Sequence, residues 1–254
     1  MIFYFTATGN SLYAAEKIAE ATGDSLVSIG GALRDELYDY DIGDGEYLGF
    51  VVPTFAGTLP GAVGLFLERL ALRGYGNHFV YGVFTCGESD GFESAALCAM
   101  LKAKGVSFAG SFELVMPDNF IVWSEVPPQE KLNAILENAD RRLDGIIASI
   151  KAKKPGKIDT GVPRDLFMRL AEFSTSKHTS ILHSDDKCTG CGLCEEICPM
   201  RCIKKDGEGR PLWEGLCAMC FACLHRCPVS AIQHGKDTQG KGRYVNPKVA
   251  FKNK

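Results

Sequence analysis

The sequence has 254 residues, of which 46% are hydrophobic and 23% charged, and a formal net charge of −3. This length fits one large domain or an ordinary domain with a small one, and the composition is typical of a globular protein with a sizeable core. No apolar run approaches the roughly 18–20 residues that cross a bilayer, which argues against membrane insertion. The apolar start lacks the basic segment of a signal peptide, so we expect a cytoplasmic protein.

The first 153 residues alternate between short apolar runs and helix-like segments. Runs rich in β-branched or aromatic residues predict strands over 2–5, 26–29, 47–52, 79–85 and 112–116. Apolar residues at helical spacing predict helices over 11–21, 62–72, 92–104 and 129–153. The alternation of strands and helices predicts an α/β domain over residues 1–153, built on a doubly wound five-stranded parallel sheet.

Residues 154–182 separate this domain from a cysteine-rich domain over 183–235. The stretch begins like a linker, with basic residues and with Pro155, Gly156, Gly161 and Pro163. We expect a short amphipathic helix to follow and to connect the two domains, its apolar side formed by Leu166, Phe167, Leu170 and Phe173.

The chain has 11 cysteines, nine of them between residues 188 and 227. Without a signal peptide, such a concentration indicates metal ligation rather than disulfides. Eight of the nine form two runs of equal spacing, C-x2-C-x2-C-x3-C-P, which are Cys188, Cys191, Cys194 and Cys198, and then Cys217, Cys220, Cys223 and Cys227. In bacterial ferredoxins this run binds [4Fe-4S] clusters, and the fourth cysteine of each run ligates the cluster of the other.

The spacing therefore predicts two interlocked cluster sites. Cluster I would be bound by Cys188, Cys191, Cys194 and Cys227, and cluster II by Cys217, Cys220, Cys223 and Cys198. Zinc also uses paired C-x-x-C motifs, but a tetrahedral zinc needs two pairs and leaves the third and fourth cysteines of each run unexplained. The ninth cysteine, Cys202, is expected to pack on the cluster as a small apolar residue.

A polar loop follows the first predicted strand, with the sequence Thr6-Ala7-Thr8-Gly9-Asn10-Ser11. A loop between the carboxyl end of a strand and the N-terminus of a helix presents free amides and the positive end of the helix dipole, so it favours an anion. Its side chains add hydrogen-bond donors without charge, and neither a Walker loop nor a G-x-G-x-x-G fingerprint is present. The loop predicts a phosphate monoester site, with an ordinary helix N-cap as the alternative.

This loop resembles the phosphate loop of flavodoxins, which bind FMN. Residues 53–60 and 85–91 resemble the flavodoxin loops on either side of the isoalloxazine ring. With its two cysteine runs, the whole chain resembles a flavodoxin–ferredoxin fusion of anaerobic bacteria and archaea. The resemblance implies a flavodoxin-like sheet domain, then a small α+β ferredoxin-like domain of the bacterial type.

The resemblance also implies the residues that contact FMN. Contacts to the phosphate would come from Thr6, Thr8, Gly9, Asn10 and Ser11. Contacts to the ring would come from Thr54, Phe55, Ala56, Gly57, Thr58, Thr85, Cys86, Gly87 and Asn119. Two aromatic residues each have two possible positions. Phe55 either stacks on the ring or belongs to the core, and Trp123 either caps the ring or packs on the ferredoxin-like domain.

The implied function is that of an electron-transfer iron–sulfur flavoprotein, with two [4Fe-4S] clusters, FMN, and a redox protein as donor or acceptor. The alternative is a flavin-dependent reductase of a small substrate that the clusters feed, for which no general acid/base pair is visible. A redox sensor is a third interpretation, and it lacks a recognisable binding module. A homodimer stays open.

The charge of the loaded protein bears on its partners. Two clusters and a phosphate would bring the net charge to roughly −9, which argues against a nucleic-acid partner. The last stretch, residues 236–254, is basic, with six Lys or Arg against one Asp. We interpret it as a solvated tail, with packing over the acidic clusters or steering of a partner as alternatives.

Overall fold

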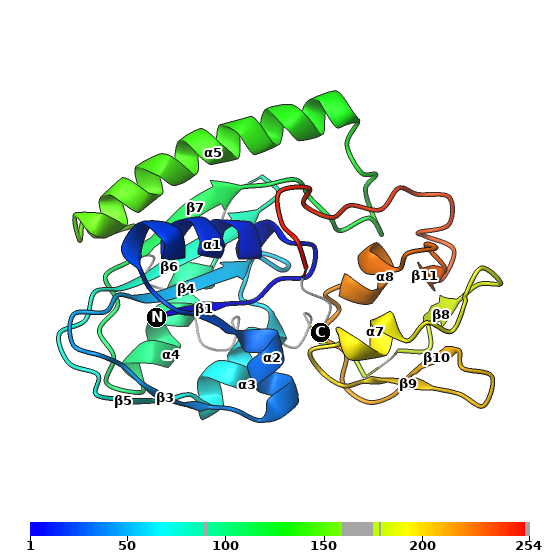
Figure 1. The fold of residues 1–254 in the computed structure, drawn as a ribbon, viewed down its shortest axis with the longest axis horizontal. Coiled ribbons are helices and arrows are strands. Elements are labelled where there is room, and N and C mark those ends of the chain that lie inside the picture. Colours follow the sequence, from blue (N-terminus) through cyan, green and yellow to red (C-terminus); the bar gives the residue numbers. More distant parts are fainter. Residues whose placement is uncertain (89–90, 159–174, 178, 252–254) are drawn as a thin grey trace.

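The computed structural model describes residues 1–88, 91–158, 175–177 and 179–251. Its N-terminal part is a five-stranded parallel sheet with helices on both faces (Figure 1). The strands are β1 (Ile2–Tyr4), β2 (Leu26–Ser28), β4 (Leu48–Pro53), β6 (Val80–Cys86) and β7 (Ser111–Val115), in the order β2-β1-β4-β6-β7. Counted along the chain, this is the 2-1-3-4-5 order of flavodoxin-like folds, so the predicted fold class is confirmed.

Different helices cover the two faces of the sheet. One face carries α1 (Asn10–Thr22) and α5 (Gln129–Lys151), and the other carries α2 (Ile29–Asp35), α3 (Gly61–Arg69) and α4 (Glu93–Lys102) (Figure 1). Successive side chains of the central strand β4 point to opposite faces of the sheet. Val51 packs with α1 and α5, whereas Phe50 and Val52 pack on the other face. A strand that is apolar on both faces is typical of a buried parallel sheet.

Two short segments differ from the sequence-based expectation. The helix predicted over 62–72 ends at Arg69, and the residues after it form β5 (Ala71–Arg73), which pairs with β3 (Asp39–Asp41) outside the main sheet. Helix α2 was not predicted, since its neighbouring glycines lower the helix propensity. It forms because the Ser28 hydroxyl accepts a hydrogen bond from the Gly31 amide at 3.1 Å and caps the helix.

The cysteine-rich part is a small α+β unit. In it β8 (Leu182–Ser184) pairs with β11 (Ile232–His234), and β9 (Ile203–Lys205) pairs with β10 (Pro211–Trp213), both antiparallel. Two short helices, α7 (Leu193–Glu196) and α8 (Ala222–Arg226), pack together. The predicted connecting helix lies outside the described residues, with its apolar positions Leu166, Phe167, Leu170 and Phe173.

The C-terminal segment packs against the rest of the protein. Tyr244 is 3% exposed and Asn246 is fully buried. Figure 1 shows the segment in red, running from β11 back to the loop between β1 and α1, where the Asn246 amide donates to the Thr8 carbonyl at 2.7 Å. The interpretation as a solvated tail is therefore wrong for the described residues up to 251.

Within the described ranges, no helix is both long enough and apolar enough to span a membrane.

Candidate functional site

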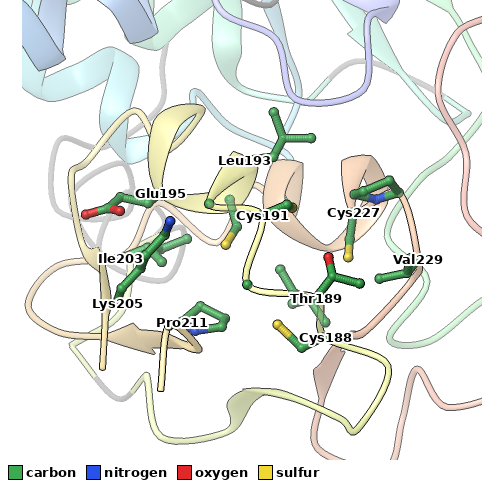
Figure 2. A pocket seen from close by; sticks show the side chains of 16 residues that line it. Cys188, Thr189, Cys191, Leu193, Glu195, Ile203, Lys205, Pro211, Cys227 and Val229 are labelled. Carbon is green, nitrogen blue, oxygen red and sulfur yellow. The ribbon is translucent and has the colours of Figure 1, made fainter. Parts of the chain in front are cut away.

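Four cysteines surround a first cysteine hollow of about 430 Å³, a volume that includes space open to solvent, namely Cys188, Cys191, Cys194 and Cys227. Figure 2 shows the sulfurs of three of them, Cys188, Cys191 and Cys227, directed into the same space. The loop wraps tightly around this space because Gly190 and Gly192 have φ angles of 67° and 81°, which favour glycine.

A second cysteine hollow of about 370 Å³, measured in the same way, is lined by Cys198, Cys217, Cys220 and Cys223. Each hollow thus receives three thiols from one run and the fourth from the other. The structure brings together the same two groups of four that the spacing assigns to clusters I and II. In both groups the thiols surround a space rather than a point, and among the described residues no three His, Cys, Asp or Glu side chains converge on a site for a single metal ion.

Burial opposes ionisation of several of these thiols. It raises the pKa of Cys194 to about 11 and that of Cys220 to about 12, because a thiolate loses its hydration inside the protein. Iron ions in the hollows would reverse this preference, since their positive charge stabilises the thiolate. Backbone amides already point at the sulfurs, with Met219 donating to Cys217 and Ala231 to Cys227, each at 3.3 Å.

The ninth cysteine of this segment also reaches the second hollow. Cys202 is 3% exposed, its Sγ lies 3.5 Å from the Sγ of Cys198, and it hydrogen-bonds to Cys217. These hydrogen bonds and burial raise the pKa of Cys202, while the bond with Cys202 lowers the pKa of Cys198, so the shared proton resides on Cys202. Apolar packing, the sequence-based expectation, therefore misses a thiol that bonds to two ligand positions.

The loop between β1 and α1 lines a hollow of about 400 Å³ at the carboxyl edge of the sheet, which we call the loop hollow. Thr6 Oγ1 accepts from the Gly9 amide at 3.1 Å, and Thr8 Oγ1 accepts from Asn119 Nδ2 at 2.6 Å. Each hydroxyl keeps its proton for an acceptor that binds in the hollow. Gly9 is the N-cap of α1, with φ at 101°, and no side chain caps this helix, so the alternative of an ordinary side-chain cap is wrong.

A larger hollow of about 730 Å³ lies between the sheet loops and the C-terminal region, and we call it the interface hollow. One wall is formed by residues 54–56, 118–120 and Trp123, and the other by residues 219–221. It shares Thr54, Phe55, Asp118 and Asn119 with the loop hollow, so the two spaces form one continuous site. The Thr54 hydroxyl is buried there with no hydrogen-bond partner among the described residues, as expected where a polar ligand binds.

The predicted FMN contacts divide between these two spaces. The loop hollow is lined by Thr6, Thr8, Asn10, Ser11, Thr54, Phe55, Thr85, Cys86, Gly87 and Asn119. Ala56 and Trp123 line the interface hollow only. Gly9, Gly57 and Thr58 line neither hollow. Thr58 turns back to pair with Phe55 through the backbone and is fully buried.

Residues 179–236 match the family model described as a 4Fe-4S dicluster domain. The C-terminal region is a 4Fe-4S dicluster domain. This match decides between iron–sulfur and zinc as interpretations of the cysteine runs. The comparison with curated proteins found no match.

Similar solved structures include a flavodoxin from Streptococcus pneumonia TIGR4, at 17% identity over 57% of this chain and 97% of that chain, with a TM-score of 0.34. The Megasphaera elsdenii flavodoxin in its two-electron reduced form is 16% identical over 56% of this chain and 99% of its own, with a TM-score of 0.32. Rubredoxin oxygen:oxidoreductase from Desulfovibrio gigas is 16% identical over 60% of this chain and 36% of its own, with a TM-score of 0.34. The flavodoxin-like fold assignment rests on the strand order, not on these low scores.

His225 in α8 connects the dicluster domain to the sheet. The Tyr244 amide donates to His225 Nδ1 at 3.1 Å, so the ring proton is on Nε2, which donates to the Asn119 carbonyl at 2.7 Å. Burial lowers the pKa of His225 to about 4, and the ring is therefore neutral near pH 7. The sequence contains one signal for this role, the position of His225 between the cluster cysteines Cys223 and Cys227.

The C-terminal segment, which follows the dicluster domain in the sequence, covers the β1–α1 loop. Tyr244 Oη and Asn246 Nδ2 both donate to Asn10 Oδ1, at 2.8 and 3.1 Å, and Asn10 Nδ2 donates to a backbone carbonyl at 3.0 Å. Because the Asn10 side chain is held by three protein groups, we expect its backbone amide to face a ligand. Val249 covers Gly9 so closely that a Cβ on Gly9 would lie 2.5 Å from its Cγ2.

Replacement of Gly9 by Ala should loosen this segment. The alanine would need a φ near 101°, which L side chains rarely adopt, and its Cβ would collide with Val249. We expect faster hydrogen exchange of the backbone amides of residues 244–251, measured by mass spectrometry. Gly64→Ala in α3 is the matched control, since nothing lies within 4 Å of a Cβ at that position. Equal exchange in the two variants would contradict the packing described here.

Proposed function

We propose that the protein is an electron-transfer iron–sulfur flavoprotein that holds two [4Fe-4S] clusters and one FMN. The interface hollow carries this proposal. One of its walls belongs to the loops of the flavodoxin-like sheet, and the other includes Cys220, which also lines the second cysteine hollow. A flavin ring in this hollow would lie directly beside a cluster ligand, so the geometry supports electron transfer within one chain.

The first cysteine hollow offers four thiols, the number that a [4Fe-4S] cluster requires, and the second offers the same number besides Cys202. Cluster I would occupy the first hollow and cluster II the second. The dicluster match supports iron–sulfur chemistry, and the pairing of thiols between the runs supports two clusters rather than one. When bound, the clusters carry single electrons, and FMN accepts two electrons that it can release one at a time.

The residues present fit FMN without a charged phosphate ligand. The hydroxyls of Thr6 and Thr8 and the first amides of α1, which have no acceptor within the helix, would hold the phosphate. The unpartnered Thr54 hydroxyl would donate to the flavin in the interface hollow, and Phe55 and Phe120 would supply apolar contact. Neutral donors suit the phosphate monoester of FMN and leave no basic side chain for a second phosphate.

The alternative, a flavin-dependent reductase of a small substrate, needs a proton donor or acceptor over the ring. Asp118 is the carboxylate that lines the interface hollow among the described residues. Its Oδ1 accepts a hydrogen bond from the Phe120 amide at 3.0 Å, whereas the single proton of the Ser124 hydroxyl lies closer to the Phe120 carbonyl, at 3.1 Å, than to Asp118 Oδ2, at 3.4 Å. A single carboxylate with one oxygen engaged by the backbone supplies no acid/base pair over the ring, which favours an electron carrier over a substrate-converting enzyme.

The proposal includes a redox protein as donor or acceptor and a cytoplasmic location. The cysteines of both runs are free of disulfides, which supports a reducing compartment for this location. The proposed domain boundaries remain 1–153, 154–182, 183–235 and 236–254.

Chemical analysis tests the cofactor content directly. Protein purified without oxygen and supplied with iron, sulfide and FMN should contain about eight irons, eight sulfides and one FMN per chain. Iron without flavin would mean that the flavodoxin-like part has only a structural role. About four irons per chain would mean that the protein binds one cluster rather than two. Steady turnover of a small substrate without an added acceptor protein would favour the reductase instead.

Replacement of Thr8 by Val should weaken FMN binding by about 10- to 100-fold, because a hydrogen bond to a charged phosphate is lost. The dissociation constant is measured by quenching of flavin fluorescence in FMN-depleted protein that retains its clusters. Thr8→Ser is the control, since it keeps both the hydroxyl donor and the acceptor for Asn119 and should restore the affinity. If the Val variant and the original protein bound FMN with equal affinity, the phosphate would not contact the Thr8 hydroxyl.

A further inference from the structure

The two cysteine runs end in segments of the same shape but different chemistry. The segments are Cys198-Pro199-Met200-Arg201-Cys202 and Cys227-Pro228-Val229-Ser230-Ala231. The fourth residue of each has a positive φ, 50° at Arg201 and 52° at Ser230. In each, the amide of the fourth residue donates to the carbonyl of the last cysteine of its own run, Arg201 to Cys198 at 3.3 Å and Ser230 to Cys227 at 3.0 Å. The backbone environment is therefore matched, and the difference is a thiol at position 202 against a methyl group at position 231.

The Cys202 thiol contacts two ligand positions of cluster II. Its Sγ lies 3.5 Å from the Sγ of Cys198, and Cys217 is its second sulfur neighbour, so its single S–H proton is shared between these two acceptors. Sulfurs that ligate iron as thiolates can only accept hydrogen bonds, so Cys202 is the donor. Cluster II thus gains a side-chain S–H donor that the matched position beside cluster I does not supply.

Two effects on the cluster II potential oppose each other. Reduction adds negative charge to a cluster, and burial disfavours that charge. Two ligand positions of cluster II, Cys198 and Cys217, are buried, whereas Cys191 of cluster I is exposed to solvent. Burial alone would therefore make cluster II harder to reduce than cluster I. A hydrogen bond to a ligand sulfur acts in the other direction, because it stabilises the more negative reduced state.

We propose that Cys202 is a tuning residue whose thiol raises the reduction potential of cluster II, so that this buried cluster can accept an electron from the exposed cluster I. This inference rests on the proposed function. In the step concerned, one electron leaves reduced cluster I, which is oxidised, and enters oxidised cluster II, which is reduced. No bond forms or breaks, and the proton stays on Cys202. The electron enters at cluster I from a one-electron redox protein and continues toward the interface hollow beside Cys220.

The test is a redox titration of the fully loaded protein, followed by electron paramagnetic resonance of the reduced clusters. In Cys202→Ala one of the two cluster potentials should become more negative, and the other should stay unchanged. We expect a threefold to tenfold shift in the equilibrium constant between the clusters, about 30 to 60 mV for one electron. Cys202→Ser keeps a donor at the same position and should restore most of the shift.

The repeat supplies the matched control. Ala231→Cys adds the same thiol beside Cys227 and should move the other potential, the one unaffected by Cys202→Ala, to more positive values. If Cys202→Ala fails to hold its cluster, the Ser variant and Ala231→Cys still decide the question. Unchanged potentials in the variants that retain about eight irons, or a shift of the same cluster in both, would overturn the proposal. These potentials can be measured with or without FMN, so failure of the tuning role is distinguishable from failure of the flavin site.

Discussion

The hydrogen bond from His225 Nε2 to the Asn119 carbonyl joins the dicluster domain to the carboxyl edge of the sheet. His225 is buried and neutral, so loss of this bond would leave a polar group unsatisfied in the interior. The side chain of Asn119 bonds in turn to Thr8. Asn119 thus connects helix α8 of the dicluster domain to the β1–α1 loop, beside the interface hollow that it also lines.

The C-terminal segment also bonds to both partners of this contact, the dicluster domain and the β1–α1 loop. The Tyr244 amide bonds to His225 and its hydroxyl bonds to Asn10, while Arg243 donates to the carbonyl of Ile232 in β11 at 3.0 Å. The sheet and the dicluster domain are therefore joined by buried polar contacts as well as by the covalent linker. The two sites share a wall, so electron transfer between them does not require one tethered domain to diffuse to the other.

Local spacing explains why part of this site was predictable. In the cysteine runs, the gaps between successive cysteines indicate which thiols face the same cluster. The structure places the same eight cysteines in the same two groups. The predicted phosphate loop is also local, because a strand, a loop rich in Thr, Asn and Ser, and a helix are consecutive. The parallel sheet follows from apolar runs such as residues 47–52, whose burial on both faces is visible in composition alone.

The remaining features depend on contacts between distant segments. Nothing near Tyr244 or Asn246 indicates that they reach Asn10, more than 200 residues away, so the basic segment reads as a solvated tail. Cys202 is an ordinary small residue until the fold brings Cys217 beside it. Helix α2 shows the same limit on a smaller scale, because the cap from Gly31 to Ser28 and the burial of Ile29 and Ala32 together offset the low propensity of its glycines.

The most direct measurement of how the chain connects its cofactors is an anaerobic crystal structure of the FMN-loaded protein, with anomalous diffraction at the iron absorption edge. We predict iron in both cysteine hollows, the flavin ring in the interface hollow, and the iron site at Cys220 nearer to the ring than the site at Cys188. A ring bound away from residues 54–56 and 118–120, or a ring nearer to the Cys188 site, would contradict this arrangement.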